Sequence, residues 1–264
     1  MEIDQNGCWI KRCSKERIFD REFPAFLKTI VDDGLLNGSS LAEIDYLQVH
    51  SERLRKTFTS IPGTSDQVSV LDIGTTPFTW FIKRMYPQYR ISTIDITDRM
   101  ETGSERFSIE FKRCNLEELA LPFDDDLFNV IIFCEVLEHI FAPPSAVLKE
   151  IRRILRPGGK LILSVPNIAA LYKRVRLLMG RSILDAADLI GSEFRMAHLH
   201  EYTSKEISAL LEANNLTIVY RKYLYTTSRR RQAPMDLVMR AYDVCTRLVP
   251  PFRSFIHIEC EKPS

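Results

Sequence analysis

Short apolar runs alternate with helix-like segments through the middle of the chain. Strand-like runs rich in β-branched or aromatic residues occur at 68–73, 90–95, 107–111, 128–136 and 160–166. Apolar positions at helical spacing predict helices near 77–86 and over 144–155. Because neighbouring parallel strands need crossover connections, this alternation predicts a parallel sheet with helices on both faces.

The two ends of the chain extend this pattern. A Thr203-to-Glu206 capping box predicts the start of a helix, followed by strands over 216–225 and 253–261. The full expectation is an α/β fold, Rossmann-like and doubly wound, with a mostly parallel seven-stranded sheet, an N-terminal helical extension and inserted helices.

The expected domain division follows from turn residues after position 60. Residues 15–60 carry apolar side chains at helical spacing, and a turn-rich stretch then separates them from the first strand. We therefore expect a helical extension or lid over 1–61. The main domain should occupy 62–264, with insertions near 167–202 and 226–252.

Composition and charge narrow the class of protein. Of the 264 residues, 45% are apolar and 27% are charged, and the net charge is +1, which is typical of a globular protein with no nucleic-acid partner. No apolar run approaches about 18 residues, so we expect a cytoplasmic protein. No C-x-x-C pairing links the cysteines, so no metal is expected and reduced thiols are predicted. The cysteines are Cys8, Cys13, Cys114, Cys134, Cys245 and Cys260.

The first strand-to-helix turn is the first candidate for chemistry. Asp72 ends a buried strand, Gly74 follows in a tight turn, and Thr76 and Pro77 have the residue types of a helix N-cap and first position. Ligands of open α/β sheets bind at this edge. Asp95, at the end of the next strand, can take both hydroxyls of a ribose. Since neither further glycines nor a Walker lysine is present, an uncharged nucleoside fits better than a pyrophosphate.

Two longer segments, LPFDDDLFNVIIFCEVLEHI (121–140) and LKEIRRILRPGGKLILSVPN (148–167), carry a family resemblance. Together with VLDIG and IDIT they resemble class I S-adenosylmethionine-dependent methyltransferases over 68–166. The branch is that of the ubiquinone and sugar O-methyltransferases, of the type 11/23 kind. The later segment 198–220 is similar to the helix and strand that follow the sheet in that branch.

The resemblance implies S-adenosyl-L-methionine as cofactor and assigns roles to residues. The implied contacts are Asp72, Gly74 and Glu135 with the methionine part, Asp95 with the ribose, and Ile96, Asn115 and Leu116 with the adenine. Core packing is the alternative for Ile96, Leu116 and Val136.

The loop after Gly74 departs from the family pattern. Where the family has glycines, this chain has Thr75, Thr76, Pro77 and Phe78, whose side chains would crowd the ligand. We expect a differently built loop in which a threonine hydroxyl, that of Thr75, contacts the cofactor. Weaker binding and loss of binding are the alternatives.

Histidines are the candidate bases, because removal of a proton from an alcohol or carbon acceptor needs a group that titrates near neutrality. His139 is the first candidate for the base, and His198 and His200 are candidates for contacts with the acceptor. A purely structural role is the alternative for each of them. His50 and His257 have no motif support and receive no role.

The predicted reaction is methyl transfer, at oxygen, to a small-molecule, sugar or lipid-linked acceptor. Basic amphipathic stretches at 168–181, 221–231 and 235–249 predict either peripheral contact with the inner face of a membrane or packing on the domain itself. Two other classes remain open. One is an inactive scaffold on the same fold, and the other is a nicotinamide-dependent oxidoreductase, which the missing glycines disfavour.

Overall fold

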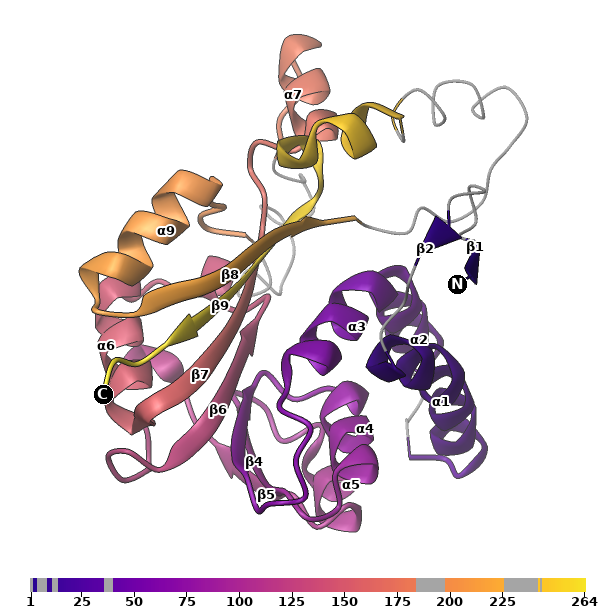
Figure 1. Ribbon diagram of the computed structural model, residues 1–264, viewed down its shortest axis with the longest axis vertical. Coiled ribbons are helices and arrows are strands. Elements are labelled where there is room, and N and C mark those ends of the chain that lie inside the picture. The colour runs from indigo at the N-terminus through magenta and orange to yellow at the C-terminus, as the bar shows by residue number, and fades with distance from the viewer. Residues whose placement is uncertain are drawn as a thin grey trace.

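A computed structural model describes residues 2–3, 9–10, 14–35, 40–183, 198–225, 242 and 244–264. Seven strands form one sheet in the order β5-β4-β3-β6-β7-β9-β8 (Figure 1). They are β3 (Ser69–Ile73), β4 (Arg90–Asp95), β5 (Glu110–Arg113), β6 (Phe128–Cys134), β7 (Leu155–Pro166), β8 (Thr217–Leu224) and β9 (Phe255–Glu261). Strands β3 to β7 pair in parallel, and β9 is antiparallel to both of its neighbours. The predicted mostly parallel seven-stranded sheet is confirmed.

Helices cover both faces of the sheet (Figure 1). One face carries α1 (Ser14–Asp32), α2 (Ser40–Val49), α3 (Ser51–Ser60), α4 (Pro77–Met85) and α5 (Glu101–Arg106). The other face carries α6 (Pro144–Ile154) and α9 (Ser204–Ala213). Helix α7 (Leu171–Leu178) projects beyond the carboxyl end of β7. Three short 3-10 helices also lie in the described part of the chain. They are η1 (Leu116–Glu118), η2 (Leu137–His139) and η5 (Pro250–Phe252). A further pair of strands, β1 (Glu2–Ile3) and β2 (Trp9–Ile10), is antiparallel.

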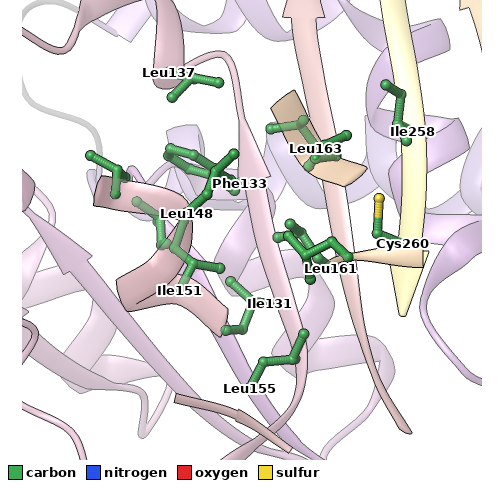
Figure 2. Packing of buried hydrophobic residues seen from close by; sticks show 14 of the residues in the cluster. Ile131, Phe133, Leu137, Leu148, Ile151, Leu155, Leu161, Leu163, Ile258 and Cys260 are labelled. Atoms are coloured by element: carbon green, nitrogen blue, oxygen red, sulfur yellow. The ribbon is translucent and has the colours of Figure 1, made fainter. Parts of the chain in front are cut away.

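The pleat of the central strands divides the hydrophobic core in two. Ile131 and Phe133 of β6 pack toward α6 and α9, whereas Val130 and Ile132 pack with the helices of the opposite face. Figure 2 shows the first cluster, in which Cys260 lies among aliphatic side chains. Its free thiol acts there as a small hydrophobic group.

The N-terminal helices share the core of the sheet. Phe19 and Phe23 of α1 contact Phe78 and Phe81 of α4 in edge-to-face pairs, with ring centroids 5.0 to 6.4 Å apart. Aromatic pairs of this kind add about 0.5–1.5 kcal/mol each beyond the area that they bury. The helical segment is therefore fixed against the first strand-to-helix unit, close to the predicted ligand site.

The structure can be compared with the predictions for one helix cap, one strand and one turn. The Thr203 hydroxyl accepts from the Glu206 N–H and the Glu206 carboxylate accepts from the Thr203 N–H, so the predicted capping box is confirmed. The expected strand over 107–111 begins only at Glu110, because Ser108 has φ +55°. The R-P-G-G segment over 156–159 follows the end of α6 and forms a bulge inside β7, where Gly158 has φ +71°.

Several sequence features fall outside the described residues. They include Cys8, Cys13, the insertion over 184–197 and the basic stretch over 226–231. Only part of the stretch over 235–249 is described, and 244–248 of it are helical. None of the helices in the described part of the chain is long and apolar enough to cross a membrane.

Candidate functional site

A cavity of about 1300 Å³ opens at the carboxyl ends of the parallel strands. It lies where β3 is flanked by β4 and β6, which is the point at which the strand order reverses. Among the predicted site residues, all but Asp72, Thr75 and His200 line it. The wall also includes side chains from α2 and α7, so elements distant in sequence meet around one space.

Gly74 is the residue of the first loop that faces the cavity. Its φ of +87° lies in the region that favours glycine, and an added Cβ would stand 3.0 Å from Cγ2 of Val136. The Gly74 N–H donates to the carbonyl of Ile94 at 3.0 Å. This hydrogen bond holds the backbone of the loop against β4. A side chain at position 74 would press on Val136 in the loop after β6.

The bulky residues after Gly74 do not crowd the cavity, contrary to expectation. The Thr75 hydroxyl lies 2.6 Å from that of Thr93 inside the protein, and Phe78 is buried among the N-terminal helices. Thr76 caps α4 and Pro77 occupies its first turn, as predicted. The expected contact of a Thr75 hydroxyl with the cofactor is therefore replaced by an internal hydrogen bond, and the side chains of the loop point away from the ligand space.

Asp72 lies beneath this loop and outside the cavity lining. Its Oδ2 accepts from the Thr79 hydroxyl at 2.5 Å. Burial raises the pKa of the Asp72 carboxyl to about 7. The carboxyl therefore supports the loop from below and does not line the space where the methionine part of the cofactor was expected.

Asp95, at the end of β4, faces the cavity with a fixed carboxylate. Its Oδ2 accepts from the Thr75 N–H at 3.1 Å, and its Oδ1 accepts from the N–H and hydroxyl of Thr97 at 2.9 and 3.1 Å. An ionised carboxylate has about four acceptor positions. At least one of them stays available for a hydroxyl of a ligand, in an orientation that the three internal donors set.

Two apolar side chains and an amide lie next to Asp95. Ile96 is 41% exposed and lines the cavity together with Leu116. Asn115 accepts the Glu117 N–H on its Oδ1 at 3.1 Å and so begins η1. Its amide NH₂ group remains as a hydrogen-bond donor. A flat heterocycle would find apolar walls and a polar edge here.

Glu135 follows β6 directly and has φ +56°, which is uncommon for a residue with a side chain. Its Oε1 accepts from the Ser164 hydroxyl at 2.8 Å, and its N–H donates to the Ser164 carbonyl at 3.0 Å. Burial raises the pKa of Glu135, whereas the guanidinium of Arg53 from α3 lowers it. The N-terminal helices thus place a buried cation opposite the end of β6.

A polar cluster lies at the other end of the cavity, in η2 and the segment before α9. The rings of His139 and His198 meet edge to face with centroids 4.9 Å apart. His198 Nδ1 lies 2.7 Å from Oε1 of Glu201, and the second oxygen of Glu201 forms a buried ion pair with Lys173 of α7. His200 instead packs on Tyr202, with ring centroids 4.6 Å apart.

Glu138 is a buried member of the same cluster. It is 1% exposed, and neither of its carboxylate oxygens has a hydrogen-bond partner among the described residues. Burial, followed by the negative charge of Glu135, raises the pKa of Glu138 well above its ordinary value. Buried carboxyl groups are almost always hydrogen-bonded, so this exception indicates that a ligand or an ion binds beside Glu138.

Several of these residues were not found from sequence. Tyr46 of α2 and His50, the N-cap of α3, line the cavity, and burial lowers the pKa of His50 to about 4, so this histidine is neutral. Glu201 stands three residues after His198, a spacing too common to single out. Lys173, one of the basic residues of the stretch over 168–181, is 2% exposed and paired with Glu201, which the sequence pattern does not reveal.

Comparisons with known proteins identify the family of the chain. The family described as a methyltransferase domain matches residues 37–221. A ubiquinone/menaquinone biosynthesis C-methyltransferase UbiE of Desulfotalea psychrophila is 27% identical over 194 residues, which are 67% of this chain and 77% of that protein. The UbiE of Hahella chejuensis is 33% identical over 131 residues, 45% of this chain and 51% of its own length.

Solved structures support the same fold. The putative methyltransferase in a complex with the Haloferax volcanii Trm112 activator matches with a TM-score of 0.58 at 15% identity, over 97% of this chain and 100% of that one. A methyltransferase from Methanosarcina mazei matches with a TM-score of 0.54 at 21% identity, over 76% and 94% of the two chains. At such identities the likeness concerns the fold alone.

Proposed function

The chain belongs to the class I S-adenosylmethionine-dependent methyltransferases, and we propose that it methylates a hydroxyl oxygen of a largely apolar small molecule. One observation carries the proposal. A single cavity joins the Asp95 end, which suits a nucleoside, to the cluster around His139 and His198, which suits proton removal. The sulfonium of the cofactor supplies the methyl group.

Three features of the first half of the cavity support the cofactor site. The Asp95 carboxylate has an acceptor position left for a ribose hydroxyl. Ile96 and Leu116 provide apolar walls for an adenine, beside the Asn115 amide. Gly74 allows the backbone to lie close to the ligand. These residues fit S-adenosylmethionine and offer no phosphate-binding loop for a dinucleotide.

The histidine pair supports general-base chemistry in the second half. Glu201 holds His198 at Nδ1, and a carboxylate in this position fixes the ring and stabilises the imidazolium that forms when the other nitrogen takes a proton. We therefore propose His198 as the base and His139 as its neighbour in contact with the acceptor. The residues of α2 and α7 would orient the acceptor and exclude water.

The cavity wall favours an apolar acceptor over a sugar. Most of its surface is apolar, including Leu171, Val175 and Met179 on the α7 side and Phe255 on the sheet side. Methylation of a ring carbon next to an ionised hydroxyl is the second candidate. It is favoured by the relatives, which are named C-methyltransferases. Proton and carbon NMR of the isolated product would separate an O-methyl from a C-methyl group.

We also propose that α7 contacts a membrane and takes up a lipid-linked acceptor there. Leu178 and Met179 are 87% and 57% exposed at the tip of this helix, beside the exposed Arg174 and Arg181. Leu178→Asp should weaken binding to phosphatidylcholine–phosphatidylglycerol vesicles by about 10- to 100-fold, since a buried leucine contributes roughly 1.5–3 kcal/mol. Val219→Asp, on the exposed side of β8, is the control. Equal sedimentation of both variants with vesicles would exclude this contact.

The test of the proposed function is calorimetric titration with S-adenosylmethionine, S-adenosylhomocysteine and NAD. Micromolar binding of the first two, with no binding of NAD, is expected. Binding would justify an acceptor screen with phenolic quinol precursors first. Tight cofactor binding without turnover on any acceptor would favour a scaffold on this fold, and binding of NAD alone would favour an oxidoreductase.

A further inference from the structure

We propose that Glu138, His139 and His198 bind a first-row divalent transition-metal ion at the acceptor end of the cavity. Their spacing along the chain does not predict a metal site, because Glu138 and His139 are adjacent and His198 follows about sixty residues later. The fold brings η2 against the segment before α9, where the Leu199 N–H donates to the Glu138 carbonyl at 2.8 Å. This hydrogen bond holds the two halves of the site together.

The distances within the cluster suit one metal ion. One candidate ligand atom from each of the three side chains lies within 4.8 Å of the others, and Glu138 Oε1 is 3.9 Å from His139 Nε2. Zinc binds nitrogen and oxygen ligands at about 2.0–2.2 Å, so two ligands of one ion stand roughly 3–4 Å apart. Small rotations of these side chains would therefore complete the coordination without movement of the backbone.

Glu138 provides the strongest reason to expect a cation. Its carboxylate is buried and has no side-chain hydrogen-bond donor among the residues that the structure describes, although it belongs to the wall of the cavity. A buried carboxylate is costly unless it is paired, hydrogen-bonded or bound to a metal. A metal ion would satisfy both oxygens at once, whereas no described side chain does so.

The surrounding charges agree with a cation at this point. Glu135, Arg53 and Lys173 act on Glu138, and Glu201 is paired with Lys173. The negative charge of Glu135 repels a negative charge on Glu138, and a divalent ion bound by Glu138 would offset this repulsion.

His198 has the second interaction that is typical of a metal-binding histidine. A ligating imidazole almost always donates its other N–H to a carboxylate or a carbonyl, which fixes the tautomer and the orientation of the ring. The Glu201 carboxylate accepts a hydrogen bond from Nδ1 of His198 at 2.7 Å, so Nε2 of His198 is the nitrogen that would bind the metal. The ion pair with Lys173 in turn fixes Glu201.

The ligand types select the class of metal. Two imidazoles and one carboxylate suit Zn²⁺, Fe²⁺, Mn²⁺ or Co²⁺, whereas Mg²⁺ and Ca²⁺ prefer oxygen ligands throughout. Three protein ligands leave coordination positions open toward the cavity. Resting on the proposed function, these positions would take an acceptor that bears two adjacent oxygen atoms and would favour its ionised form. In the metal-bound protein the ion would therefore promote loss of the acceptor proton in place of His198, whose Nε2 would be occupied by the metal.

The experiment uses the untagged full chain after treatment with a chelator. Titration with Co²⁺ should give visible absorption bands that saturate at one ion per chain, and calorimetry with Zn²⁺ should give the same stoichiometry. Glu138→Gln and His198→Ala should each weaken binding at least tenfold, because each removes one of three ligands. His200→Ala is the matched control and should leave metal binding unchanged.

Absence of saturable Co²⁺ or Zn²⁺ binding, or binding that both ligand variants leave unaltered, would overturn the site. If Glu138→Gln proved unfolded by circular dichroism, His198→Ala would decide alone, since the His198 side chain is 36% exposed and its loss leaves the core intact. S-adenosylmethionine titration of the metal-free protein is a separate readout. Cofactor binding without metal binding would reject the metal site and retain the proposed function.

Discussion

Replacement of Asp72 by asparagine should make the protein more stable at neutral pH. The carboxyl is 5% exposed, and its pKa is raised from 3.8 to about 7 by burial. Between these two values the folded protein binds a proton that the unfolded chain has released, so wild-type stability falls as the pH rises. At 1.36 kcal/mol per pKa unit, the lost stability reaches about 4 kcal/mol at pH 7 and then stays constant.

The amide introduced by Asp72→Asn cannot ionise, and its oxygen can still accept from the Thr79 hydroxyl, as the carboxyl does at 2.5 Å. The difference in unfolding free energy between Asp72→Asn and wild type should therefore grow by about 4 kcal/mol from pH 4 to pH 8. Urea unfolding at several pH values measures it, with Asp98→Asn, which replaces an exposed carboxylate, as control. Parallel stability curves for Asp72→Asn and wild type would refute the argument that this carboxyl is protonated in the fold.

Three further predictions concern the cavity. Asp95→Ala should weaken S-adenosylmethionine binding by about 10- to 100-fold in calorimetry, because hydrogen bonds to a charged group contribute roughly 1.5–3 kcal/mol; unchanged affinity would exclude the ribose contact. Gly74→Ala should lower the Tm by several degrees and weaken cofactor binding, whereas Gly158→Ala, whose φ is also positive but whose Cβ would meet nothing within 4 Å, should lower the Tm less and spare binding. Once an acceptor is known, His198→Ala should reduce kcat by at least about 100-fold and His200→Ala should not; equal kcat values would contradict the base assignment.

Much of the fold could be predicted because strands, turns and caps depend on neighbours in sequence. The strand at 90–95, the capping box at Thr203 and the helix start at Pro77 were placed correctly from residue type and spacing. The start of β5 was placed wrongly, because the positive φ of Ser108 is a turn feature that the apolar pattern does not reveal. The bulge after Arg156 likewise depends on pairing between distant strands.

The positions of Asp95 and Asn115 in the cavity wall were predictable for the same reason. Asp95 and Asn115 follow successive strands, and the carboxyl ends of parallel strands meet at one edge of a sheet. The Thr75 contact was misjudged because the direction of its side chain depends on Thr93 of the neighbouring strand, eighteen residues away.

Residue type and spacing were enough to establish the α/β alternation, the edge of the sheet at which the cavity opens, and the family resemblance. The packed fold was needed to show which charged residues are buried and which histidine has a carboxylate partner. Glu138, Lys173 and Glu201 are ordinary charged residues in sequence, and their burial arises when η2, α7 and the segment before α9 meet. Burial and long-range pairing are properties of packed elements, so no local pattern encodes them.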